Sequence, residues 1–358
     1  MKARTAVNGN RRTTKVSSKK TDYIATVFPG NDEPIPEDVG RMLSELSVGI
    51  GMQVLAIVQY GPPCAGCGRE TERSQVNGDL YSAVQKILAD IPQGRKIAVL
   101  LESTGGFAKS AFKIARLIRR HCGGFTAVVP TFAKSAATLL ALGADEIVMG
   151  PDAELGPLDA QVTDFDREQH LSALEVVQSL ERLNEAAVEA VDSQIMIWQS
   201  RSRKKIDTLM PVTMHFVAEM MKPLLDKIDM VQYTRYARVL KVAQEYATRL
   251  LIPRCDPDAA TMIAKALTET FPDHDFAICE EEARNLGIRI AKTDKQLGNF
   301  LNKLSARIGG ETLIGLIKEV RHDNKKDSST SAQIDGINGR QGGYSSGGHR
   351  HQQIRQNQ

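Results

Sequence analysis

The chain alternates between short continuous apolar runs and longer segments in which apolar residues recur every three or four positions. Short runs of this kind predict buried strands, and the periodic segments predict amphipathic helices. The predicted strands are "QVLAIVQY" (53–60), "RKIAVLLES" (95–103), "FTAVVP" (125–130) and "DEIVM" (145–149). Helical segments precede the first strand and fill each interval between strands. This order predicts an α/β core over residues 23–165, with a largely parallel sheet and helices on both faces.

The pattern changes after about residue 165. Residues 166–320 are dominated by helical periodicity, and we predict a helical extension over this range. Its predicted helices cover 171–200, 211–228, 233–251 and 257–271. Residues 1–22 are predicted to be a disordered basic arm, and residues 321–358 a disordered, glycine-rich, low-complexity tail.

Charge is unevenly distributed along the 358 residues. The net charge is +3, but residues 1–20 carry seven basic side chains and no acid, which leaves −4 for the rest of the chain. A mildly acidic body argues against nucleic-acid binding, so the arm is the segment through which a separate partner could be contacted. No apolar run reaches the 18–20 residues of a membrane span, and we expect a cytoplasmic protein.

Two turns carry the residues with chemical potential. "STGG" (103–106) follows the second predicted strand, and "FAKSA" (132–136) follows the third. Because the carboxyl ends of parallel strands lie along one edge of a sheet, Gly105 and Gly106 are expected beside Ser135. Ser135 would begin a helix, where free N–H groups favour negative charge. With the N–H of Ala136, these turns supply a nucleophile and an oxyanion hole, the parts that acyl transfer needs.

The central block also resembles a known family. "LLESTGGFAKSAFKIARLI" and "VVPTFAKSAATLLALGADEIVMGPDAELGPLDAQV" resemble the serine dehydrogenase proteinases of the Clp-protease/crotonase superfamily, relatives of signal peptide peptidase A and the Clp proteolytic subunit. The resemblance covers most of residues 50–292. It implies a stacked ββα superhelix, Ser135 as the nucleophile of a serine endopeptidase, and an oxyanion hole from Gly105, Gly106 and Ala136. It also implies a peptide or unfolded-protein substrate and a homo-oligomer in which helices pack subunit against subunit.

The general base is where the chain departs from the family pattern. Where relatives of the Clp subunit carry a histidine, this chain reads "LGPLDAQV", and no lysine occurs between Ser135 and Lys204. His274 in "FPDHDF" and His170 are the leading candidates, with Asp273 and Asp275 beside His274 as candidate orienting groups. Since serine is a weak nucleophile without a base, two alternatives stay open. One is a catalytically impaired peptide-binding or scaffold protein of the same fold, and the other is an acyl-thioester enzyme of the crotonase kind.

The five cysteines are too few and too scattered for a disulfide framework. Cys64 and Cys67 form a CxxC pair, which is half of a zinc site and has no second CxxC at zinc-ribbon spacing. The pair is a weak metal candidate, and we predict no cofactor.

Overall fold

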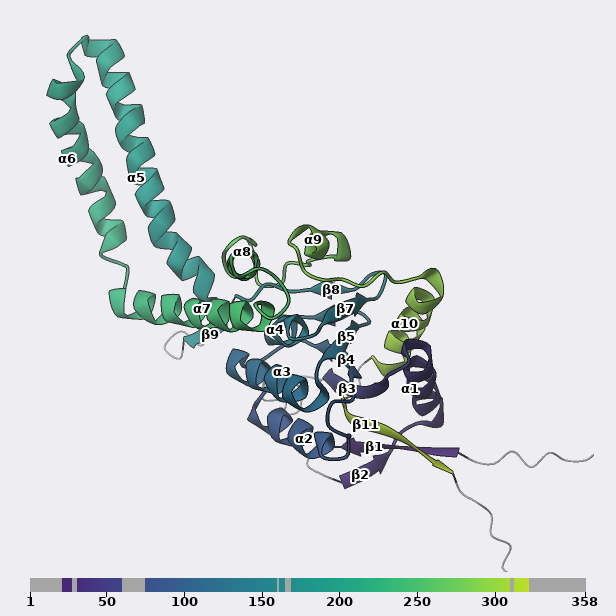
Figure 1. Ribbon diagram of the computed structural model, residues 1–358. Coiled ribbons are helices and arrows are strands. Elements are labelled where there is room, and N and C mark those ends of the chain that lie inside the picture. The colour runs from purple at the N-terminus through teal and green to yellow at the C-terminus, as the bar shows by residue number, and fades with distance from the viewer. Residues whose placement is uncertain are drawn as a thin grey trace, which may run out of the picture. The chain divides into compact units, whose positions relative to one another are not determined.

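Four neighbouring parallel strands form one side of the main sheet, as Figure 1 shows for the computed structural model. The structure describes residues 21–27, 31–59, 75–159, 161–164, 169–309 and 312–321. Within these, the strand order is β2-β1-β11-β3-β4-β5-β7. Strands β3 (Gln53–Gln59), β4 (Ile97–Ser103), β5 (Phe125–Val129) and β7 (Glu146–Met149) run parallel. All four coincide with strands predicted from the sequence.

Further strands extend this unit beyond β3 and near the end of β4. Strand β11 (Thr312–Arg321) runs antiparallel to β3 and joins it to β1 (Thr21–Val27) and β2 (Asn31–Pro34). Near the carboxyl end of β4, β6 (Phe132–Ala133) pairs with β4 and with β8 (Glu154–Leu155). Strands β9 (Gln161–Asp164) and β10 (Gln169–Ser172) form a separate two-stranded sheet. The first two residues of β1 belong to the arm (1–22) that the sequence pattern predicts to be disordered.

Helices cover both faces of the sheet, as predicted for parallel strands, whose two faces are apolar (Figure 1). One face packs against α1 (Glu37–Ile50) and α10 (Lys295–Ile308), with Leu43, Leu100 and Leu304 fully buried between them. The other packs against α2 (Gly78–Leu88), α3 (Ala108–Cys122) and α4 (Ala136–Leu142). These observations confirm the predicted α/β core with a helical C-terminal part.

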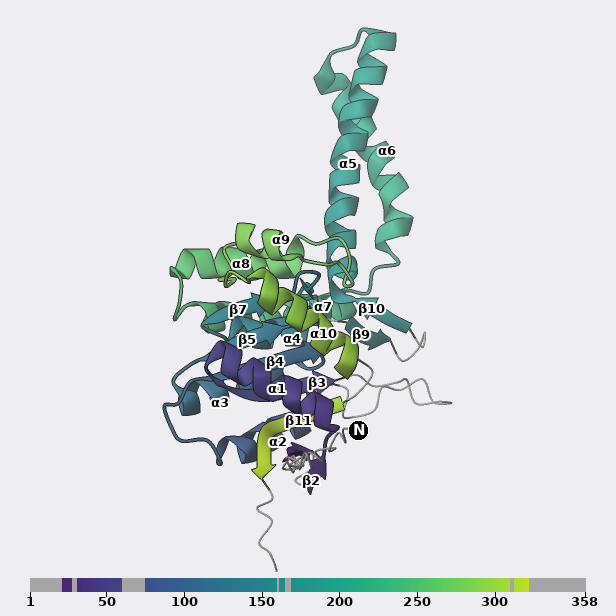
Figure 2. The same cartoon turned by 90° about the vertical axis from the view of Figure 1, so that its right-hand side faces the viewer.

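The C-terminal helices are α5 (Ala173–Ser202), α6 (Ile206–Leu225), α7 (Met230–Leu251), α8 (Pro257–Glu269) and α9 (Glu280–Asn285). Helices α5 and α6 pack on each other as a hairpin that extends away from the sheet in both views (Figures 1 and 2). Helix α7 returns to the core and lies over α3 and α4, where Tyr246 stacks on Phe112 with ring centroids 4.4 Å apart.

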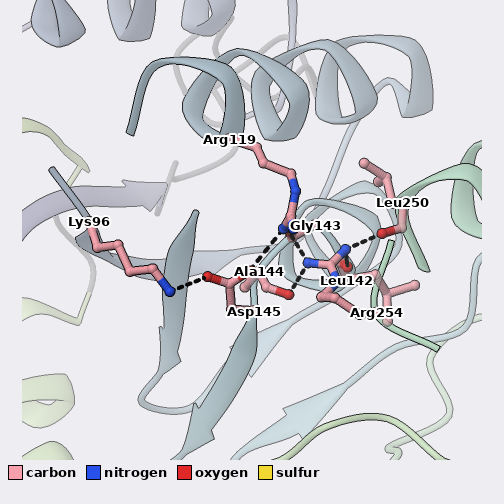
Figure 3. Close-up of polar contacts among 8 residues, drawn as sticks. All are labelled: Lys96, Arg119, Leu142, Gly143, Ala144, Asp145, Leu250 and Arg254. Carbon is pink, nitrogen blue, oxygen red and sulfur yellow. Dashed lines mark hydrogen bonds and ion pairs between the residues drawn. The ribbon is translucent and has the colours of Figure 1, made fainter. Parts of the chain in front are cut away.

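One arginine ties the end of α7 to the end of α4 (Figure 3). The Arg254 guanidinium donates to the carbonyls of Leu142 and Gly143 at 2.8 and 2.6 Å, and also to those of Ala144 and Leu250. Burial lowers the pKa of Arg254 to about 10, so the side chain stays charged at neutral pH. Its charge therefore lies at the negative end of the α4 dipole.

We expect Arg254→Met to destabilise the protein by about 2 kcal/mol, because it leaves partly buried helix-end carbonyls without donors. The free energy of unfolding from urea denaturation measures the change. Arg249→Met is the matched control, because Arg249 lies exposed on α7 and has only a 3.7 Å pair with Glu245. This control should shift stability by less than about 0.5 kcal/mol. Equal losses in the two variants would contradict the assigned role of Arg254.

Candidate active site

Ser135 occupies a sharp turn between β6 and α4. Its backbone has φ +49° and ψ −116°, a conformation that non-glycine residues rarely adopt and that costs on the order of 1–3 kcal/mol. The side chain does not cap α4 by a hydrogen bond, although it stands at the N-cap position. The Ser135 hydroxyl is therefore not used to cap the helix, which is the usual structural role of a serine at this position.

Of the two glycines in the preceding turn, Gly105 lies directly against Ser135, and Gly106 lies against Val76. A Cβ on Gly105 would lie 2.8 Å from the Lys134 carbonyl oxygen and 3.0 Å from Ser135 Cβ. A Cβ on Gly106 would lie 2.7 Å from the backbone of Val76, with which Gly106 forms a bridge. Both glycines also have positive φ, +115° and +142°, so a side chain at either position would displace the turn.

A buried polar chain fixes the orientation of this glycine turn. The Gly105 N–H donates to Ser103 Oγ at 3.2 Å, and Ser103 Oγ donates to Gln59 Oε1 at 3.0 Å. Both Ser103 and Gln59 are buried. The amide of Gly105 is thus engaged, whereas those of Gly106 and Ala136 have no acceptor among the described residues. Two of the three predicted oxyanion residues therefore offer a free N–H group.

Thr138, a buried residue of α4, stabilises the same turn through its hydroxyl. Its hydroxyl donates to the carbonyls of Ala133 and Gly156, and it accepts from the Gly156 N–H at 3.0 Å. These hydrogen bonds connect Ala133, two residues before Ser135, to Gly156, which follows β8. They therefore stabilise the backbone of the turn that carries Ser135.

Ser135 opens onto a cavity of about 740 Å³. The glycine turn and Ala136 form one side, α7 forms another, and the segment around His274 contributes a third. His274 therefore lies at the same cavity as Ser135, although it is far away in the sequence. The connection is a path of short pairings, since β6 pairs with β8 and Leu155 of β8 exchanges two 2.9 Å hydrogen bonds with Ile278.

Among the described residues, the nearest acidic partner of His274 is Asp159, and not Asp273 or Asp275. His274 Nδ1 lies 4.0 Å from Asp159 Oδ2, and it is buried without a hydrogen bond in the described residues. Asp159 is only 2% exposed, and it accepts from the Ser172 hydroxyl at 2.5 Å and from the Leu174 N–H at 3.1 Å. The carboxylate is therefore held at the N-terminus of α5, where the helix dipole favours its charge.

The two aspartates beside His274 in the sequence make contacts with other groups. Asp273 accepts the N–H of Asp275 at 3.2 Å and so shapes the turn. The carbonyl of Asp275 accepts from Lys134 Nζ at 3.4 Å. Lys134 itself is paired with Glu154 at 2.7 Å and also reaches the carbonyl of Phe276, so it connects the serine turn to the histidine loop.

The side chains of the remaining candidates fall outside the described residues. His170 lies on β10, and its side chain is outside the described residues, as are Cys64 and Cys67. In the part of the chain that the structure describes, no group of three or more His, Cys, Asp or Glu side chains could hold a metal ion. The described helices also include none long and apolar enough to cross a bilayer.

Distant matches among solved structures include two proteases. A mutant of the membrane-bound stomatin-specific protease 1510-N is 14% identical, has a TM-score of 0.37, and the match covers 68% of this chain and 88% of that one. ClpP1 from Listeria monocytogenes is 13% identical, with a TM-score of 0.34 and coverage of 71% and 99%.

Two curated relatives are uncharacterized proteins of Methanocaldococcus jannaschii, 25% and 24% identical over 199 residues. Each match covers 56% of this chain, and the chain spans about half the length of these relatives. The family model of the ClpP-like SDH-type serine proteinases matches residues 79–234, which include the glycine turn, Ser135 and Asp159. Over this segment the chain is similar to the ClpP-like SDH-type serine proteinases.

Proposed function

We propose that this protein is a serine endopeptidase that cleaves peptide bonds through an acyl-enzyme on Ser135. The observation that carries the proposal is that the strained Ser135 shares one cavity with two free amides and with His274. A nucleophile, a base and donors for an oxyanion are the groups that acyl transfer requires. The substrate would be a peptide or an unfolded segment.

In the proposed reaction, His274 accepts the Ser135 hydroxyl proton as Oγ attacks the scissile carbonyl carbon. The carbonyl oxygen becomes an oxyanion and accepts hydrogen bonds from the N–H groups of Gly106 and Ala136. Collapse of this intermediate breaks the C–N bond, and His274 returns the proton to the leaving amine. Water, deprotonated by the same ring, then hydrolyses the ester.

Asp159 is proposed to orient His274 and to stabilise its charged form. The 4.0 Å distance between His274 Nδ1 and Asp159 Oδ2 is longer than a hydrogen bond. Catalytic contacts of this kind commonly shorten when substrate binds. The same long distance, together with the lack of a lysine between Ser135 and Lys204, favours the second candidate function, a peptide-binding scaffold with little turnover.

Labelling with a fluorophosphonate probe tests the proposal. Intact mass spectrometry of the full chain should show one adduct per chain, and peptide mapping should place it on Ser135. The reason is that these probes react with a serine only when a base and an oxyanion hole activate it. An unmodified chain, or an adduct on another serine, would refute the peptidase assignment. The scaffold function would then become the leading candidate.

We also propose that the protein assembles as a homo-oligomer through α6. The α6 face against α5 is buried at Thr213, Val217 and Met221. One position earlier in each turn, a second apolar stripe is exposed, formed by Val212, Phe216, Met220 and Leu224. A contiguous apolar stripe of this kind is typical of a surface that binds another protein. Sedimentation of the wild type beside a Phe216→Ser variant tests the assembly, which the substitution should weaken.

A further inference from the structure

Helix α7 contributes a distinct wall to the cavity at Ser135. The wall consists of Arg238, Val239, Val242 and Ala243. Their spacing of one, four and five positions places them on a single face of the helix. The face combines apolar side chains with one guanidinium, so it offers a ligand in the cavity an apolar surface and a positive charge.

The other charged groups that line the cavity either have partners within the protein or lie on a different wall. Lys134 is neutralised by Glu154 at 2.7 Å, and Asp159 is buried beneath the surface and hydrogen-bonded. Asp275 lies exposed on the histidine loop. Arg238 is also exposed, and among the described residues no carboxylate lies within 4.0 Å of its guanidinium. Arg238 is therefore a cation of the cavity wall without an ion-pair partner in the described chain.

We propose that Arg238 binds a carboxylate of the substrate, so that the site selects peptides with a carboxylate near the bond that is cut. The inference rests on the proposed function and deepens it. Arginine suits this role because its planar group donates two parallel hydrogen bonds to one carboxylate. Asp275 repels an anion from the histidine wall, so the carboxylate is directed to α7. The neighbouring Val239 and Val242 then contact an apolar side chain beside the acid.

Two sources could supply this carboxylate, an acidic side chain or the C-terminus of a peptide. Four fluorescent hexapeptides distinguish them. They differ only in Asp or Asn at one central position and in a free or amidated C-terminus. Their equilibrium binding is measured by anisotropy on the full-length Ser135→Ala variant, so that no peptide is consumed. We expect one of the two carboxylates to strengthen binding about tenfold over its neutral counterpart, as a charge-assisted hydrogen bond at a partly exposed site should.

The Arg238→Gln change in this background should abolish that preference, and Arg238→Lys should retain only part of it. Arg235→Gln is the matched control, because Arg235 is exposed on the same helix and does not line the cavity. It should leave the tenfold preference intact. Asp275→Asn should strengthen binding of the carboxylate peptides. Lack of measurable binding, equal binding of all four peptides, or equal weakening of all four by Arg238→Gln would overturn the inference.

Failure of the inference can be separated from failure of the proposed function. Fluorophosphonate labelling of Ser135 in a chain carrying Arg238→Gln reports the activated serine with a small uncharged probe. Intact labelling without a carboxylate preference would reject the role of Arg238 and keep the peptidase. A carboxylate preference in a chain whose Ser135 never reacts would reject the peptidase and keep Arg238 as a determinant of peptide binding.

Discussion

Ser135→Ala is expected to lower peptide hydrolysis by a factor on the order of 10⁴–10⁶, because it removes the atom that forms the acyl-enzyme. The fold should be unchanged, since the Ser135 side chain makes no capping hydrogen bond to α4. Initial rates on an unstructured fluorogenic protein substrate, with thermal unfolding beside them, measure both effects. Ser179→Ala, an exposed serine on α5, is the control and should retain full activity.

A second replacement at this position separates backbone strain from chemistry. Ser135→Gly should be as inactive as Ser135→Ala but more stable than it by about 1 kcal/mol, because glycine adopts positive φ without strain. If Ser135→Ala hydrolysed the substrate at the wild-type rate, Ser135 would not be the nucleophile. If alanine and glycine gave equal stability, the backbone of the turn would not be strained.

The second large effect is expected from the base. His274→Ala should lower kcat by about 10²–10⁴-fold, the usual contribution of a positioned general base. Its stability should stay close to wild type, because His274 Nδ1 makes no hydrogen bond in the described residues. Added imidazole should restore part of the activity of His274→Ala, which a purely structural histidine would not allow. His215→Ala, exposed on α6, is the control.

Asp159→Asn tests the partner of this base. The amide keeps the shape of the side chain, and its oxygen can still accept from the Leu174 N–H while its NH2 group donates to the Ser172 hydroxyl, but it loses the negative charge beside His274. We expect kcat to fall while KM changes little, since Asp159 is buried beneath the cavity. Full activity in both His274→Ala and Asp159→Asn would exclude this pair and return attention to His170.

The sequence pattern was sufficient for the centre of the fold. Strands β3, β4, β5 and β7 are continuous apolar runs because helices cover both of their faces, so hydrophobicity alone reveals them. The same pattern placed Ser135 and the glycine turn at one sheet edge. Helix α10 and strand β11 were not predicted. The pairing of β11 with β3 joins Leu316 to Leu55 across most of the chain, and a short apolar run does not show such a partner.

The charged surroundings of the site could be predicted only in part. His274 was a candidate from its local resemblance, but Asp159 and His274 are 115 residues apart and no local spacing connects them. Their proximity depends on the two hydrogen bonds between Leu155 and Ile278. In the sequence, Arg238 cannot be told apart from the other exposed arginines of its helix. Only the structure, in which α7 forms a wall of the cavity at Ser135, distinguishes it from them.

The bridge between Leu155 and Ile278 also has a consequence for biosynthesis. In the proposed enzyme, the nucleophile leaves the ribosome 139 residues before its base, because Ser135 precedes His274 by that length of chain. At about 5–20 residues per second, the delay is roughly 7–28 seconds. During this interval, the segment that completes the cavity has not been made. The nascent enzyme is thus unable to cut itself or neighbouring chains until its C-terminal portion has been translated and has folded back.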